Sequence, residues 1–141
     1  MTKTNDRFEH GEHNEKACDY LSLKDDFRDW VITTAFYSSL HFVSSKIFPF
    51  EVPAIEGKKT QITTIDQYHT YYNNTFGKGR NISKHELLLD LVETRISQAY
   101  EFYGWLLSAA TTARYNHYQH PVEISNLAIS YMKKIKKICS N

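Results

Sequence analysis

One apolar segment, residues 27–48, limits most strongly what this chain can fold into. Apolar residues recur there at helical spacing along two adjoining lines, so a helix over this segment is apolar on most of its circumference. Such a helix needs packing partners on several sides, which places it at the centre of a bundle. Asp25 and Asp26 favour a helix start, and Pro49 and Pro53 end the helix. The first apolar line consists of Trp30, Thr33, Tyr37, Leu40, Ser44 and Ile47.

Two further helices are predicted, one before and one after this central segment. The earlier helix covers about residues 14–22 and follows a lead that contains His10 and His13. The later helix begins after Ser83, because Glu86 three residues on completes a capping box. In that arrangement each of the two side chains bonds a backbone N–H at the helix start, where the helix itself provides no acceptor.

The helical spacing of the later helix continues to Ala113, either as one rod or as two helices with a break near residues 93–97. Pro121 suits the first position of a last helix, since the N–H that proline lacks has no partner there. Residues 50–82 show no clear periodicity and are interpreted as a loop-rich insertion, in which the tyrosine-rich piece from about Asp66 to Tyr72 is a candidate short helix. The sequence therefore predicts a single domain over residues 1–141, an all-α antiparallel bundle of four to five helices.

Charge and composition exclude a dedicated duplex-DNA binder. The formal net charge is +1. Eight acidic and five basic residues give the first 30 positions a balance of −3, and twelve basic and eight acidic residues give the remainder +4. This is a mild asymmetry rather than a strongly basic surface, and it leaves room only for local contact with a few phosphates.

Three features predict a cytoplasmic protein that does not contact a membrane. No apolar run reaches the roughly 20 residues that span a bilayer. The N-terminal stretch MTKTNDRFEHGEHNEK is polar throughout and unlike a secretory signal. Cys18 and Cys139 are isolated and lack metal-ligand spacing, so they are interpreted as free thiols in a reducing compartment.

The stretch from Arg114 to His120, between two helical segments, concentrates residues that carry chemistry. An arginine holds a phosphate through a planar fork of donors that is charged at any physiological pH. A histidine can move a proton near neutrality. These two are the candidate catalytic residues of a site that cleaves RNA without a metal, or that only holds a nucleotide phosphate. Between them lie the candidate substrate-binding residues Tyr115, Asn116, His117 and Tyr118.

Each of these residues also has a structural interpretation. Arg114 can hydrogen-bond the last carbonyls of its helix, and His120 can cap the next one. His117 fits an exposed loop position. The two tyrosines can stack on bases but also suit packing against the bundle. His41, on the apolar helix, fits a core histidine more readily than a ligand to a metal.

The order and spacing of these segments resemble small prokaryotic HEPN-domain proteins over about two thirds of the chain. Residues 29–43 (DWVITTAFYSSLHFV) are similar to the second helix of that family. Residues 83–86 (SKHE) are similar to its histidine-containing start of the third helix. Residues 100–115, which end in Ala-Arg-Tyr, resemble the end of its fourth helix.

This resemblance implies a HEPN-like bundle that forms a homodimer and acts as a metal-independent ribonuclease of toxin–antitoxin or antiviral-defence type. Active members carry an arginine, a polar residue and, after four to six intervening positions, a histidine. Arg114 and His120 have five residues between them. The residue after the arginine is Tyr115, where active members prefer asparagine, aspartate or histidine, and Asn116 follows one place later.

The resemblance also implies an alternative function, because the arginine-tyrosine ending occurs in members that do not cleave RNA. Such members are modules that bind a nucleotide or a protein partner, for example a nucleotidyltransferase antitoxin. A purely structural dimer is a third reading of the chain. Neither a cofactor nor a metal site is expected in any of these cases.

Overall fold

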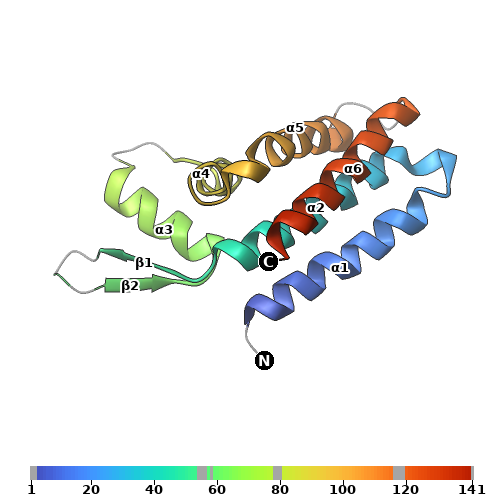
Figure 1. Ribbon diagram of the computed structural model, residues 1–141. Helices are drawn as coiled ribbons and strands as arrows, with labels where there is room; N and C mark the ends of the chain where they lie inside the picture. Colours follow the sequence, from blue (N-terminus) through green and yellow to red (C-terminus); the bar gives the residue numbers. More distant parts are fainter. Residues whose placement is uncertain (1–2, 54–56, 58, 78–80, 116–119, 141) are drawn as a thin grey trace.

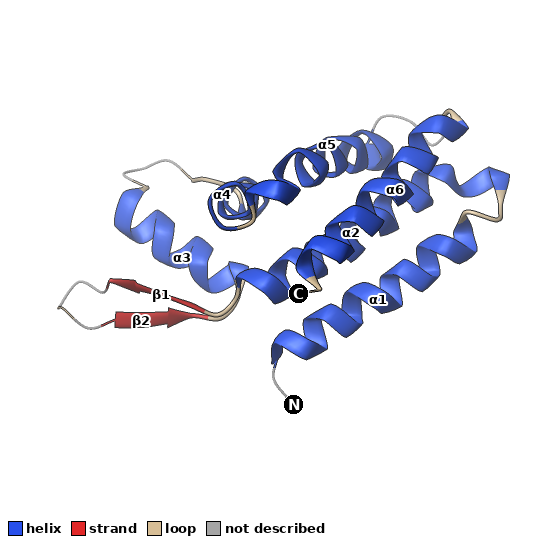
Figure 2. Ribbon diagram, viewed as in Figure 1, coloured by secondary structure: helices blue, strands red, loops and turns tan. Residues whose placement is uncertain are grey.

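The computed structural model of the protein describes residues 3–53, 57, 59–77, 81–115 and 120–140. These residues form six α-helices and one small antiparallel sheet, so the predicted all-α class is confirmed (Figures 1 and 2). The elements are α1 (Lys3–Leu21), α2 (Arg28–Ile47), β1 (Phe50–Pro53), β2 (Lys59–Ile62), α3 (Ile65–Phe76), α4 (Lys84–Arg95), α5 (Tyr100–Tyr115) and α6 (Val122–Cys139).

Helix α2 lies at the centre of the bundle, as its apolar circumference predicts. It packs against α1, α5 and α6, and also touches α4. Ile32, Phe36 and Phe42 on this helix are fully buried. Trp30 and Tyr37 belong to the predicted apolar line but are 55% and 36% exposed.

Helix α1 is longer than predicted and begins at Lys3 rather than near residue 14. His10 and His13 therefore lie in the helix, and their placement in an irregular lead was wrong. The error has a physical reason, since α1 is polar on average and its order comes from packing along the whole length of α2. At the closest approach the Ser38 hydroxyl donates to the Gly11 carbonyl at 2.6 Å.

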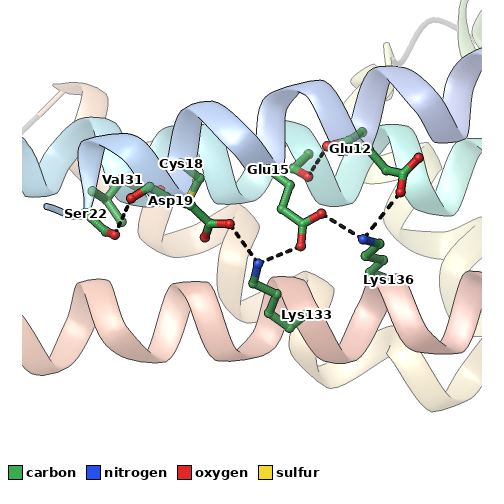
Figure 3. Close-up of polar contacts among 10 residues, drawn as sticks. Glu12, Glu15, Cys18, Asp19, Ser22, Val31, Lys133 and Lys136 are labelled. Atoms are coloured by element: carbon green, nitrogen blue, oxygen red, sulfur yellow. Dashed lines mark hydrogen bonds and ion pairs between the residues drawn. The ribbon is translucent and has the colours of Figure 1, made fainter.

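Ion pairs join α1 to α6 across the surface of the bundle (Figure 3). The Lys133 ammonium lies 2.6 Å from the Glu15 carboxylate and 3.0 Å from that of Asp19. Lys136 lies 2.9 Å from the other oxygen of Glu15 and 3.5 Å from Glu12. Burial raises the pKa of Glu15, but the hydrogen bonds and charges of the two lysines outweigh it and lower that pKa below its ordinary value. Glu15 is thereby held as a buried carboxylate.

The segment predicted as a loop-rich insertion contains a hairpin that was not predicted and a helix, α3, that covers the candidate short helix from Asp66 to Tyr72. Strands β1 and β2 pair antiparallel, with Phe50 opposite Ile62. The Thr64 side chain then accepts a hydrogen bond from the Gln67 backbone N–H and caps α3. Strands of four residues are too short to give a periodic signal, and Ile62 is buried because it lies at the base of the hairpin, where the hairpin joins the core.

The predicted boundaries of the later helices agree closely with the structure. The Ser83 hydroxyl accepts from the Glu86 backbone N–H at 3.1 Å, which confirms the predicted cap at the start of α4, and it donates to the Glu86 carboxylate at 3.3 Å. Of the two alternatives for the following segment, the broken form is correct, since a short 3-10 turn over Ser97–Ala99 separates α4 from α5. Pro121 occupies the cap of α6 rather than its first position.

The main core fills the space between α2, α5 and α6. Its fully buried members include Tyr103 and Leu106 on α5 and Met132 and Ile135 on α6. Cys18 and Cys139 are buried free thiols, and burial raises the pKa of each, to about 11 and about 12. Within the described ranges, no helix combines the length and apolar character that a membrane crossing requires.

Candidate functional site

Arg114 lies in the last turn of α5 and turns its guanidinium toward α2. The guanidinium carbon is 5.9 Å from the centre of the Phe36 ring and 5.7 Å from that of the Tyr37 ring. Both distances suit cation–π attraction. The side chain is half-buried. Arg114 is therefore a fixed cation held at the surface of the bundle, with an exposed tyrosine ring beside it.

His85 on α4 lies against the same phenylalanine. The His85 and Phe36 ring centres are 5.6 Å apart, with the rings in an edge-to-face arrangement. Burial lowers the pKa of His85, and the positive charge of Arg114 lowers it further. The packing of α4 and α5 on α2 thus brings together a guanidinium and an imidazole that is neutral at physiological pH.

Sequence reasoning did not assign His85 to a site. The only sequence feature that located His85 was the capping box, which places it in the first turn of α4. The motif does not indicate which helix this turn packs against. The pairing of His85 with Arg114, 29 positions later in the chain, depends on contacts that α4 and α5 each make with α2.

A buried hydroxyl lies beside this cluster. The Tyr103 ring is fully buried, with its centre 5.7 Å from that of Phe36. Its hydroxyl has no hydrogen-bond partner among the described residues. Burial raises the pKa of Tyr103, and the neighbouring Tyr37 adds to this shift. A buried hydroxyl without a partner costs about 1–3 kcal/mol, so the Tyr103 hydroxyl lowers the stability of the folded state.

His120 lies just before the cap of α6, and its backbone carbonyl contacts the start of α2. The Arg28 guanidinium donates to the His120 backbone carbonyl at 3.1 Å. Arg28 is the first residue of α2, whereas Arg114 contacts that helix at Phe36. These two positions on α2 are eight residues apart, about 12 Å along a helix axis. The pairing of Arg114 with His120 in one site stays a prediction.

The predicted substrate-binding residues fall at the edge of what the structure describes. Tyr115 is the last residue of α5, but its side chain lies outside the described residues. Asn116, His117 and Tyr118 lie outside them entirely. Their assignment stays a prediction.

A second polar cluster, on the other side of α2, was also missed by sequence reasoning. The rings of His10 on α1 and His41 on α2 stack with their centres 3.8 Å apart. They face a pocket of about 250 Å³ that Arg7 also lines. His41 is therefore not a satisfied core histidine but borders a cavity. In the part of the chain that the structure describes, no three histidine, cysteine, aspartate or glutamate side chains gather closely enough to hold a metal ion.

Comparisons of this chain with known protein families, with curated protein sequences and with solved structures find no match.

Proposed function

We propose that this protein is a metal-independent endoribonuclease of toxin–antitoxin or antiviral-defence type, in which Arg114 binds the scissile phosphate. The observation that carries the proposal is that Arg114 and His85 pack on one Phe36 ring, with the charge of the first lowering the pKa of the second. A phosphate clamp and a neutral imidazole are the groups that RNA cleavage by its own 2′-hydroxyl requires.

The proposed reaction is an internal transesterification. His85 accepts the proton of the 2′-hydroxyl as its oxygen attacks phosphorus, and the bond from phosphorus to the 5′-oxygen breaks. Arg114 stabilises the negative charge that builds on the non-bridging oxygens. A protonated histidine donates to the leaving 5′-oxygen. The products are a 2′,3′-cyclic phosphate and a free 5′-hydroxyl, and the atoms balance without water or a metal ion.

His120 is the candidate for that acid, supplied across a two-fold dimer. The α1–α2 connection and the start of α6 lie at the same end of the bundle, opposite the hairpin (Figure 1). Large apolar side chains are exposed at this end, among them Leu23 at 77% and Trp30 at 55%, together with Phe27 and Val122. Exposed apolar residues of this size support an interaction surface beside His120. A symmetric contact through it would present His120 of each protomer to the other.

Binding without cleavage is the second candidate function, favoured by the exposed Tyr37 ring beside Arg114. A nucleotide base can stack on an aromatic ring while its phosphate pairs with a neighbouring arginine. The same surface would then serve a module that recognises a nucleotide or a protein partner such as a nucleotidyltransferase. This function needs Arg114 and Tyr37 but neither histidine.

Cleavage of a defined RNA oligonucleotide by the purified protein tests the proposal. We expect chelator-insensitive cleavage with cyclic phosphate ends, reduced by about 10²–10⁴-fold in His85→Gln and His120→Ala and abolished in Arg114→Ala. Arg95→Ala is the matched control, because the guanidinium carbon of Arg95 lies 4.0 Å from the centre of the Phe50 ring on β1, and Arg95 takes no part in the proposed reaction. The expressed wild-type chain should also arrest growth, and Arg114→Ala should not.

Full cleavage by an Arg114→Ala, His120→Ala double variant would show that these residues are not the site. Nucleotide binding that depends on Arg114 and Tyr37, in a protein that cleaves no RNA, would establish the second function instead.

A further inference from the structure

A pocket of about 250 Å³ opens on the side of α2 that faces α1. Its walls come from three places: the first half of α1, the end of α2 with the residue that follows it, and the start of α3. The residues that line it are Asp6, Arg7, His10, His41, Ser44, Phe48, Thr64 and Ile65.

The pocket brings three nitrogen-rich side chains together. His10 and His41 stack with their ring planes 18° apart. Arg7 donates to the Thr63 backbone carbonyl and lies with its guanidinium carbon 5.4 Å from the centre of the Phe48 ring. These contacts fix the guanidinium beside the stacked imidazoles and use one of its five N–H groups as a donor to the protein.

The electrostatics of the pocket favour a negatively charged occupant. Burial lowers the pKa of His41 to about 4, and the charges of His10 and Arg7 contribute to the shift. The charged or titratable groups of the lining that face His41 are Arg7, His10 and Asp6, all on α1, while α2 and the start of α3 add only neutral side chains. Asp6 is the single acid among them. A bound anion would offset the lowering of the His41 pKa that the charges of His10 and Arg7 cause. Both imidazoles would then donate hydrogen bonds to the anion.

We propose that this pocket binds a small phosphate monoester, whose phosphate is held by Arg7, His10 and His41. Three donor side chains match the three terminal oxygens of a monoester, and a guanidinium binds two of them at once. The start of α3 at the rim adds a favourable helix dipole. Phe48 and Ile65 give the organic part of the ligand an apolar wall. The volume lies below the range of about 300–1,000 Å³ for drug-sized ligands, so the organic part is small.

This site goes beyond the proposed function and is separate from it. It involves α1, α2 and the start of α3, whereas the Arg114 cluster involves α2, α4 and α5. Each site can therefore be tested with the other intact.

Titration with glycerol phosphate, followed through the imidazole proton signals of the full chain, tests the proposal. We expect saturable shifts of His10 and His41, and affinity at least about tenfold above that for acetate, because a carboxylate offers two oxygens rather than three. Arg7→Ala and His10→Gln should each weaken binding by about tenfold or more. His13→Gln is the matched control, since His13 is exposed on the same helix and does not line the pocket.

His10 is itself exposed, so His10→Gln keeps the test valid should Arg7→Ala fail to fold. The proposal is overturned by the absence of saturable binding, by equal affinity for acetate, or by binding that His10→Gln leaves unchanged. Binding lost in Arg114→Ala would also overturn it, because the phosphate would then occupy the other site. Inorganic phosphate as a third probe separates a phosphate-only site, if it binds equally well, from the proposed monoester site.

Discussion

The Arg114 guanidinium lies 5.7 Å from the centre of the Tyr37 ring, across the contact between α5 and α2. An aromatic ring attracts a cation through its quadrupole and shields one of its faces from water. His85, on α4, packs against Phe36 as well, and the positive charge of Arg114 lowers the pKa of that imidazole. Arg114 is thus held by aromatic rings while it acts electrostatically on a titratable neighbour.

The first prediction concerns the effect of the Arg114 charge on the pKa of His85. Substitution of Arg114 by alanine removes a positive charge that disfavours protonation, so the pKa of His85 should rise toward its ordinary value while the effect of burial remains. Titration of the His85 imidazole signals by nuclear magnetic resonance measures this directly. Arg114→Lys, which keeps the charge, should leave the pKa close to that of the wild type. An unchanged pKa in Arg114→Ala would show that the two groups do not interact.

The second prediction concerns the buried hydroxyl of Tyr103. Removal of a hydroxyl without a partner relieves its desolvation cost, so Tyr103→Phe should leave the free energy of unfolding equal or raise it by about 1 kcal/mol. Denaturant unfolding measures the change. Tyr71→Phe is the comparison, because the Tyr71 hydroxyl donates to the Pro53 carbonyl at 3.3 Å and its loss should not be stabilising. A loss of more than about 1 kcal/mol in Tyr103→Phe would mean that the hydroxyl has a stabilising contact.

The third prediction concerns Glu15, which pairs with Lys133 and Lys136. Its pKa is lowered in the folded state, so its contribution to stability is complete above the ordinary carboxyl pKa of 4.5 and is lost as pH falls below that value. Glu15→Gln should lower the free energy of unfolding near neutral pH by about 1–2 kcal/mol, a figure reduced because both lysines are partly exposed. The difference from the wild type should shrink as the solution is acidified below pH 4.5.

An exposed ion pair provides the control for Glu15. Glu51 lies 3.7 Å from Lys59 and its side chain is 59% exposed, so Glu51→Gln should change stability by less than about 0.5 kcal/mol. Equal effects of the two substitutions, or a Glu15 effect that does not depend on pH, would contradict the assignment of Glu15 as a buried, paired carboxylate.

The fourth prediction compares two helical glycines. A methyl group on Gly11 would lie 2.6 Å from a ring carbon of Phe42, a core residue, so Gly11→Ala should destabilise the fold by about 1–3 kcal/mol. At Gly104 the nearest atom, on Leu89, would be 3.6 Å away, so Gly104→Ala should stabilise by about 0.4–1 kcal/mol. Thermal unfolding of the two variants should shift in opposite directions. A stabilised Gly11→Ala would mean that α1 does not approach α2 this closely.

The fifth prediction tests the proposed dimer. Trp30→Ser removes the largest exposed apolar side chain at the end of the bundle near His120, and should convert the dimer to a monomer and reduce RNA cleavage with it. Phe76→Ser is the matched control, because Phe76 is equally exposed at 56% but lies at the end of α3. Light scattering gives the mass of each variant. A wild-type chain that is monomeric at high concentration would remove His120 of a second protomer from the proposed reaction.

Local chemistry explains the parts of the fold that could be predicted. The capping box of Ser83 and Glu86 acts within one helical turn, and Pro49 and Pro121 restrict the backbone wherever they occur. The apolar circumference of α2 required neighbours on several sides whatever those neighbours were. The first half of α1 and the hairpin were missed because their order depends on what they pack against, and a mainly polar helix and four-residue strands carry little signal alone.

The sequence by itself determined a mainly helical chain with a central apolar helix, the start of α4 and the cation at the end of α5, while the structure decided between one rod and two helices over α4 and α5. Only the tertiary structure decided that this cation faces His85, that His10 stacks on His41, and that Arg7 completes a pocket with them. The physical reason is range. Caps, proline and periodicity act over a few residues, whereas each of these pairings joins residues about 30 positions apart or more, through helices that meet at angles and registers set by core packing.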